Sequence, residues 1–196
     1  MITAVILARK GSKRVPGKNK MEIGGRPMVA WAIIEALKSA YIDETAVSSD
    51  DEDVLAIAND YSVKAVRRPP YLATDDASPY DGIIDALNNI NVSEGHVVLL
   101  QPTSPCRIVD DIDHCIRTCL DFNLNAAATA AAGNAVPNGA VYVSTLAWLL
   151  GGGSWDENGL HLVPMPLSRS QDVDTLEDFK MAEAALFERA LPGYIG

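Results

Sequence analysis

Residues 2–19 read ITAVILARKGSKRVPGKN, and this stretch decides how the rest of the chain is interpreted. Its beginning, residues 2–8, is a short β-branched apolar run, which is typical of a buried strand. The glycines, the proline and the basic residues that follow are typical of a loop. The stretch therefore predicts a strand whose carboxyl end opens into a basic loop.

Positive charge is concentrated in this loop, although the chain as a whole is acidic. Residues 9–20 hold six of the sixteen Lys and Arg residues, and the formal net charge of the 196 residues is −10. Nucleic-acid-binding proteins usually carry a broad basic face, which a chain of this balance lacks. The loop is therefore expected to bind a small anion and not a nucleic acid.

Strand-like and helix-like segments alternate after the loop. The apolar spacing predicts strands at 44–50, 63–69 and 96–101, and helices at 27–40, 51–61, 79–91 and 108–122. Such alternation is typical of a mostly parallel sheet. We expect one α/β domain over residues 1–196, with three layers and helices on both faces of the sheet, and 48% hydrophobic residues are enough to fill its core.

The last third of the chain is less regular. Short strands are predicted at 125–130 and 139–144, and a further one within 148–166. The final helix, over 174–191, is strongly patterned. Its buried side is expected to carry Leu176, Phe179, Ala182 and Leu186.

Several candidate binding segments follow predicted strands. Open α/β sheets bind ligands beyond the carboxyl ends of their strands, where the basic loop, the segment after Arg67 and QPTSP (101–105) are expected to meet. Gly11 and Gly17 let backbone N–H groups approach phosphate oxygens, while Lys and Arg neutralise charge. The Walker A pattern GxxxxGK[ST] is absent. A triphosphate is the expected ligand, and a solvated surface loop is the alternative that charge alone leaves open.

Two aspartates near the end of the chain are candidate metal ligands. Asp172 and Asp174 are two residues apart, so in an extended segment both carboxylates project from one face. Mg²⁺ commonly takes one or two carboxylates and completes its shell with water and phosphate oxygens. The alternative is that Asp174 caps the final helix, because Glu177 follows it at capping-box spacing.

Five motifs indicate a family. Residues 7–19 match every fixed position of the pattern LAR-x-x-S-K-x-x-P-x-K-N, and with this signature the chain resembles the CMP-sugar synthetases, the acylneuraminate cytidylyltransferases. Four later segments are similar to further motifs of that family, in the same order: RRPPYLATDDAS (67–78), LLQPTSPCR (99–107), VPNGAVYV (136–143) and QDVDTLEDFKMAE (171–183).

The resemblance implies a nucleotide-diphospho-sugar transferase fold, which is Rossmann-like. The implied reaction transfers CMP from CTP to the anomeric hydroxyl of a sialic-acid-like 2-keto sugar acid and releases pyrophosphate. CTP and a sugar acid would be the partners, and Mg²⁺ the cofactor, because nucleotidyl transfer needs a metal to gather the charge of the leaving pyrophosphate.

The resemblance also assigns roles to individual residues. Catalytic roles are expected for Arg9, Lys18 and Asp174, with Lys18 stabilising the α-phosphate in the transition state. The expected nucleotide-binding residues are Leu7, Ala8, Arg9, Ser12, Lys13, Lys18, Asn19, Arg68 and Ser78. The expected sugar-acid residues are Gln101, Asn138 and Gly139, and the expected metal ligands are Asp172 and Asp174.

The sequence departs from the family pattern on the acceptor side. Only AAAGNAV (130–136) stands where the family has a long lobe that dimerises, so a homodimer would have to form without it. Val136 stands where the family pattern has Arg, and Pro79 where it has a second Ser. Two alternatives therefore stay open: a CTP-binding module without turnover, and a sugar nucleotidyltransferase that uses another base.

The remaining features indicate a cytoplasmic protein. The apolar run at 2–8 is too short to span a membrane and lacks the basic start and cleavage site of a secretory signal, so no membrane partner is expected. The three cysteines form no metal-binding pattern and are expected to be buried thiols.

Overall fold

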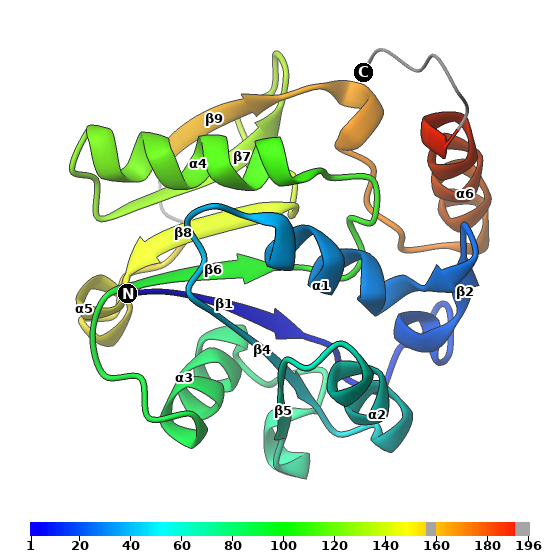
Figure 1. The fold of residues 1–196 in the computed structure, drawn as a ribbon, viewed down its shortest axis with the longest axis horizontal. Helices are drawn as coiled ribbons and strands as arrows, with labels where there is room; N and C mark the ends of the chain where they lie inside the picture. Colours follow the sequence, from blue (N-terminus) through cyan, green and yellow to red (C-terminus); the bar gives the residue numbers. More distant parts are fainter. Residues whose placement is uncertain (156–159, 191–196) are drawn as a thin grey trace.

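The computed structural model describes residues 1–155 and 160–190, which contain a seven-stranded sheet in the order β5-β4-β1-β6-β8-β7-β9 (Figure 1). Every neighbouring pair is parallel except the two pairs made by β8. The prediction of a mostly parallel α/β sheet is confirmed. The strands are β1 (Ile2–Leu7), β4 (Glu44–Ser49), β5 (Lys64–Arg67), β6 (His96–Leu100), β7 (Ala126–Ala131), β8 (Val141–Thr145) and β9 (His161–Met165).

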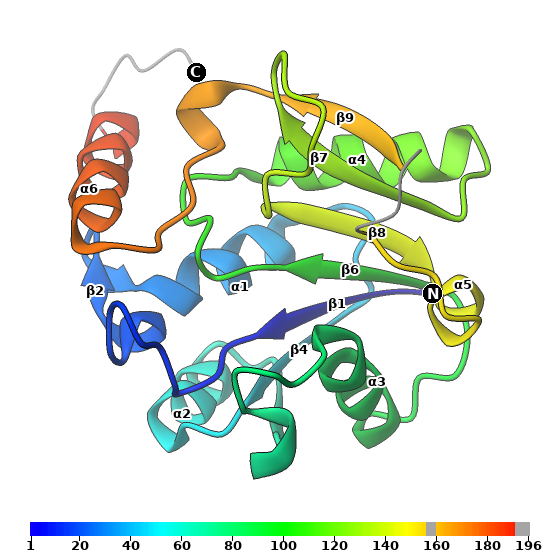
Figure 2. The ribbon, with the colours of Figure 1, turned by 180° about the vertical axis from the view of Figure 1, so that it is seen from behind.

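Helices cover both faces of this sheet, as the alternation predicts (Figures 1 and 2). One face carries α1 (Met28–Lys38), α2 (Glu52–Asp60) and α4 (Val109–Asp121). The other face carries α3 (Pro79–Asn89) and α5 (Leu146–Leu150). The smaller elements are β2 (Glu22–Ile23), β3 (Arg26–Pro27), η1 (Lys18–Lys20), η2 (Pro70–Leu72) and η3 (Leu167–Arg169).

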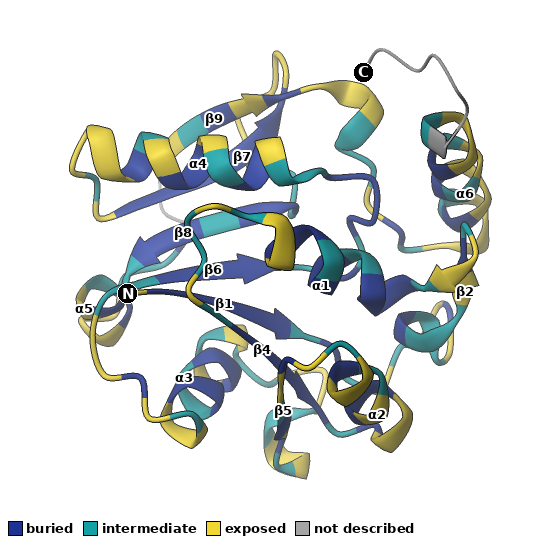
Figure 3. Cartoon of the chain, viewed as in Figure 1, coloured by how far each residue is buried: buried dark blue, intermediate teal, exposed yellow. Residues whose placement is uncertain are grey.

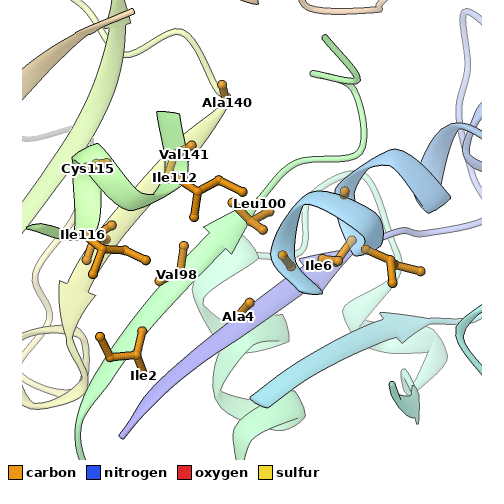
Figure 4. Packing of buried hydrophobic residues seen from close by; sticks show 14 of the residues in the cluster. Ile2, Ala4, Ile6, Val98, Leu100, Ile112, Cys115, Ile116, Ala140 and Val141 are labelled. Atoms are coloured by element: carbon orange, nitrogen blue, oxygen red, sulfur yellow. The ribbon is translucent and has the colours of Figure 1, made fainter. Parts of the chain in front are cut away.

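Strand β1 lies at the centre of the sheet and is buried on both sides (Figure 3). Its side chains alternate between the two layers because successive residues of a strand face opposite ways. Ile2 and Ile6 pack with the α1, α2 and α4 layer, whereas Val5 packs with the α3 layer. Figure 4 shows Ile6 near Leu100 and Ala4 near Val98 of the neighbouring strand. This burial fixes the start of the basic loop at the carboxyl end of β1.

The final helix, α6 (Leu176–Ala190), lies beyond the carboxyl ends of the central strands and beside β2 (Figure 1). Phe179, Ala182 and Leu186 are buried, as predicted, in a cluster that includes Ile23 of β2. Leu176 is 59% exposed, so its predicted burial is wrong. The helix packs against β2, the start of α1 and the residue Cys106, and not across a sheet face. This small contact surface covers only a narrow stripe of the helix. The predicted end at residue 191 lies outside the described residues.

The connection between β7 and β8, residues 132–140, is a short hairpin whose tip is exposed (Figure 3). Thr129 of β7 joins it to the sheet: its Oγ1 donates to Oδ1 of Asn138 at 2.7 Å and accepts from the backbone N–H of Val141 at 3.0 Å. A short hairpin is therefore present at the position where the sequence lacks the long lobe expected from the family pattern.

The three cysteines are free and buried, as predicted. Within residues 1–155 and 160–190, no helix has the length and apolar character needed to cross a bilayer.

Candidate nucleotide-binding cleft

A cleft of about 530 Å³ opens at the carboxyl ends of β1 and β6, between the basic loop and the segment that follows β5. This is the edge at which open α/β sheets bind ligands. Ten of the residues expected in the site line it: Leu7, Arg9, Ser12, Lys13, Lys18, Asn19, Arg68, Ser78, Gln101 and Asp174. The other four expected residues, Ala8, Asn138, Gly139 and Asp172, are not among the residues that line it.

Internal hydrogen bonds give the basic loop its shape. Gly17 has a φ of 70°, in the left-handed region that favours glycine, and it precedes the turn η1. Nδ2 of Asn19 donates to the carbonyl oxygen of Arg9 at 2.9 Å, which joins the two ends of the loop. Asn19 therefore holds the loop closed while it also lines the cleft.

The cations of the loop face two carboxylates across the cleft. Asp75 is paired with Arg9 at 2.7 Å and with Lys13 at 2.5 Å. The hydrogen bond from Lys13 lowers the pKa of the Asp75 carboxyl most, and the hydrogen bond from Arg9 lowers it further. Asp174 is paired with Arg14 at 3.0 Å and with Lys18 at 3.2 Å. The cleft is thus lined by cations that already have anionic partners.

Lys18 is the most enclosed of these cations, since its side chain is 13% exposed. Its Nζ donates to the carbonyl oxygen of Val173 at 2.8 Å as well as to Asp174. The backbone N–H of Val173 in turn donates to the carbonyl oxygen of Thr103 at 2.7 Å. These bonds bring the basic loop, the segment after β6 and the segment before α6 to one point.

The cap of α6 leaves the side chain of Asp174 free for the cleft. The N–H of Thr175 donates to Asp178 at 2.8 Å, and the N–H of Asp178 donates to Oγ1 of Thr175 at 3.2 Å. This reciprocal pair is a capping box. The alternative in which Asp174 and Glu177 form the box is therefore wrong, because Thr175 and Asp178 occupy those positions.

Asp172 lies near Asp174 at the margin of the cleft. Loss of water around its carboxyl group raises its pKa, a hydrogen bond with Thr103 partly opposes this rise, and the negative charge of Asp174 adds to it. Residues 1–155 and 160–190 contain no cluster of three or more His, Cys, Asp or Glu side chains arranged for a metal ion. Any metal at this site would therefore rest on the two aspartates and on ligand oxygens.

The wall opposite the loop is built from Arg68 and Ser78. Arg68 is buried, and its guanidinium donates to Oγ and to the carbonyl oxygen of Ser48 at 3.0 and 2.7 Å. Burial lowers the pKa of Arg68. Oγ of Ser78 caps α3 by accepting from the N–H of Tyr80 at 3.2 Å. Pro79, a departure from the family pattern, is the first residue of α3, where proline is well tolerated.

Ala8 is fully buried, and its backbone groups bond within the protein. Its N–H donates to the carbonyl oxygen of Ser48 at 3.0 Å, and its carbonyl oxygen accepts from Oγ of Ser49 at 2.5 Å. Ala8 therefore supports the site by joining the end of β1 to β4.

On the acceptor side, Gln101 reaches the cleft and Gly139 lies behind it. Gly139 has a φ of 83°, and a Cβ built on it would lie 3.1 Å from Oε1 of Gln101. Asn138 is used inside the protein: it accepts from Thr129 and from the N–H of Ala140, and donates to Ser170 at 3.0 Å. Gly139 thus leaves room for the Gln101 side chain, while Asn138 fixes the hairpin that carries Gly139.

Sequence reasoning missed Asp75, Arg14 and Arg107. Arg107 is 1% exposed and donates to the carbonyl oxygens of Gln101 at 2.6 Å and Ala140 at 3.1 Å. It therefore ties the segment after β6 to the hairpin. Asp75 and Arg107 stand at fixed positions of the motifs at 67–78 and 99–107, which was the signal available for them.

Comparison with known proteins agrees with this geometry. The sequence profile described as cytidylyltransferase matches residues 3–147, and the chain belongs to that family. The resemblance to the acylneuraminate cytidylyltransferases is confirmed.

Two curated relatives illustrate the similarity. The chain is 40% identical over 119 residues to the CMP-N,N'-diacetyllegionaminic acid synthase of Legionella pneumophila, which covers 59% of this chain and 51% of that protein. It is 41% identical over 106 residues to the N-acylneuraminate cytidylyltransferase of Escherichia coli, which covers 54% of this chain and 25% of that protein. The chain thus spans about half of the first relative's length and a quarter of the second's.

A solved structure shares the fold over almost the whole chain. It is that of CMP:2-keto-3-deoxy-manno-octonic acid synthetase complexed with CTP, with a TM-score of 0.79, 19% identity, and coverage of 97% of this chain and 99% of the other. The Rossmann-like fold implied by the motifs is confirmed.

Proposed function

We propose that this protein is a cytidylyltransferase that transfers CMP from CTP to the anomeric hydroxyl of a 2-keto sugar acid and releases pyrophosphate. The observation that carries the proposal is the cleft at the end of β1, where Arg9, Lys13 and Lys18 line one wall in an acidic chain. The family membership and the relatives that are named for CMP transfer to sugar acids support it.

The cations of the loop bind the triphosphate in this proposal. Arg9 and Lys13 lie at the outer part of the loop and neutralise the charge of the phosphates. Lys18 is held in place by Asp174 and the carbonyl oxygen of Val173, so its charge is already oriented before the substrate enters. A preorganised charge of this kind stabilises the transition state because it needs little rearrangement during the reaction.

Asp172 and Asp174 are the proposed ligands of Mg²⁺. Asp174 lines the cleft and Asp172 lies close enough for the charge of Asp174 to affect its pKa. Carboxylate oxygens are the donors that Mg²⁺ prefers, and one or two of them are enough, so the residues present fit this ion. When bound, Mg²⁺ would neutralise charge on the phosphate oxygens.

The acceptor would lie against Gln101, whose position depends on Gly139 and Arg107. Orientation of the acceptor hydroxyl is as important as its admission to the cleft, because transfer needs the two reacting groups in line. Arg68 and Ser78, on the other wall, would lie near the cytosine and the ribose.

The short hairpin at 132–140 favours a second candidate, a CTP-binding module without turnover. In that case the nucleotide side would bind CTP, while the acceptor side would lack the groups needed to orient a sugar acid. The side chain of Asp174 counts against this candidate, because it faces the cleft although Thr175 and Asp178 already cap the helix.

The proposal is tested by pyrophosphate release from CTP and Mg²⁺ with a panel of 2-keto sugar acids. The panel includes sialic, legionaminic, pseudaminic and octulosonic acids, and the variants are Asp174→Ala and Thr175→Ala. We expect release with one acceptor, loss of release in Asp174→Ala, and release retained in Thr175→Ala, which alters only the helix cap. CTP binding without release for any acceptor would support the binding module instead, and absence of CTP binding would overturn both candidates.

A further inference from the structure

Asp75 is a carboxylate placed inside the proposed phosphate site. It lies in the segment between η2 and α3, and its side chain contacts Arg9 at 2.7 Å and Lys13 at 2.5 Å across the cleft. All three residues line the cleft. A negative charge is thus in direct contact with two of the cations that the proposed function assigns to the triphosphate.

We propose that Asp75 is an internal counter-ion of the basic loop, which competes with the triphosphate for Arg9 and Lys13 and thereby sets the affinity of the cleft for anions. The inference rests on the proposed function in one respect, namely that these two cations bind phosphate.

Competition follows from the contacts themselves. The Lys13 ammonium and the Arg9 guanidinium each form an ion pair with one oxygen of Asp75, so a phosphate oxygen must displace the carboxylate or approach it closely. The Asp75 carboxylate and a phosphate oxygen would repel each other at such a separation, because both are negative. Solvent screens this repulsion only in part, since the side chains of Arg9 and Asp75 are 36% and 38% exposed. Binding of an anion therefore includes the cost of breaking two existing pairs.

The same contacts have a benefit in the empty cleft. Without a counter-ion, Arg9 and Lys13 would repel each other and move freely, and ordering them would cost conformational entropy at binding. Asp75 holds both side chains at the mouth of the cleft. After transfer it takes back the two cations, which favours the release of pyrophosphate.

Asp174 plays a different part, although it also pairs with two cations. It lies near Asp172, so a second carboxylate is available there for a metal ion. The charge partners of Asp75 are Lys13 and Arg9, and these lower the pKa of its carboxyl. The surroundings of Asp75 suit a counter-ion that gives way to phosphate.

The experiment is calorimetric titration with inorganic tripolyphosphate in the absence of metal, at low salt. Asp75→Asn removes the charge and keeps the shape, Asp75→Glu keeps the charge, and Asp76→Asn removes an exposed neighbouring charge that does not line the cleft. We expect Asp75→Asn to bind about tenfold more tightly than the natural protein, as two partly exposed ion pairs would predict. Asp75→Glu and Asp76→Asn should stay within about twofold, and the gain should shrink at high salt.

Unchanged or weaker binding by Asp75→Asn overturns the inference, and so does an equal gain in Asp76→Asn, which would indicate a simple net-charge effect. No detectable binding by any variant overturns it as well. Thermal unfolding of each variant verifies that the fold is intact. Titration of the natural protein with CTP and Mg²⁺ separates the two proposals: failure of CTP binding counts against the proposed function, whereas CTP binding with no gain in Asp75→Asn counts against the counter-ion alone.

Discussion

The nucleotide side of the cleft and the side expected to receive the sugar acid use their polar groups differently. On the nucleotide side, Arg9 and Lys13 form ion pairs at the surface, which a charged ligand can replace. On the acceptor side, the polar groups of Asn138 and Nη1 of Arg107 form hydrogen bonds inside the protein. The nucleotide side can therefore bind a ligand by replacing its ion pairs, whereas the acceptor side presents a fixed surface around Gln101.

The largest effect is expected from removing charge on the nucleotide side. Lys13→Ala combined with Lys18→Ala should weaken CTP binding in the presence of Mg²⁺ by about a thousandfold, since each charge-assisted hydrogen bond contributes about 1.5–3 kcal/mol. Calorimetry measures this loss. The control replaces Lys10 and Lys64, which are not among the residues that line the cleft, and should change the affinity by no more than about twofold. Equal affinities for the two double variants would contradict the assignment of the loop.

Two buried thiols measure local opening in two regions, one beside the cleft and one at the opposite edge of the sheet. Cys106 packs with the α6 cluster and adjoins Arg107 beside the cleft, whereas Cys119 lies near the end of α4, where its Sγ donates to the carbonyl oxygen of Leu124. Burial raises the pKa of both thiols to about 11. Alkylation of the native protein at pH 8 should therefore be roughly a hundredfold slower than that of an exposed cysteine.

Because the thiolate is the reactive form, the alkylation rate should rise about tenfold for each pH unit below that pKa. Mass spectrometry of the labelled peptides assigns the rate of each site. Rapid labelling of Cys106 alone would show that the region beside Gln101 and Arg107 opens locally, and would contradict the description of the acceptor side as fixed, whereas rapid labelling of Cys119 alone would show opening at the far edge of the sheet.

A methyl group at Gly139 should disturb the acceptor side selectively. Gly139→Ala places a Cβ 3.1 Å from Oε1 of Gln101, on a residue whose φ is 83°. We expect the KM for the sugar acid to rise about tenfold, the KM for CTP to change less than about twofold, and the free energy of unfolding to fall by about 1 kcal/mol. Steady-state kinetics with each substrate varied in turn provides the measurement. An equal rise of both KM values would mean that the two sides are not separable. Gly133→Ala is the control, since its Cβ would meet no atom within 4 Å although its φ is also positive.

The smallest effect is expected at the cap of α6. Thr175→Ala should lower the free energy of unfolding by about 1 kcal/mol, because it removes one half of the capping box. CTP affinity should be unchanged. Leu176→Ala, at the exposed next residue, should change stability by less than about 0.5 kcal/mol. Urea unfolding of both variants measures these free energies. A larger loss of stability for Leu176→Ala than for Thr175→Ala would support burial of Leu176, as its helical spacing predicted.

The sequence by itself determined the features that depend on neighbouring residues. The short apolar run of residues 2–8 predicts a buried strand, and the glycines and cations that follow predict a phosphate-binding loop. The motifs identify the family, and the strands and helices predicted up to residue 122 are present in the structure. These signals are local, because dihedral preferences and side-chain periodicity act over a few residues.

Only the tertiary structure decided which distant groups meet. Lys18 bonds to Asp174, 156 residues away, and the pairing of Arg9 with Asp75 depends on how the segment after β5 folds back over the loop. The packing of α6 against a small surface made by β2, α1 and Cys106 leaves Leu176 exposed, although its spacing matches that of buried residues. Periodicity shows which side of a helix is apolar, but the extent of burial depends on the size of the surface against which the helix packs.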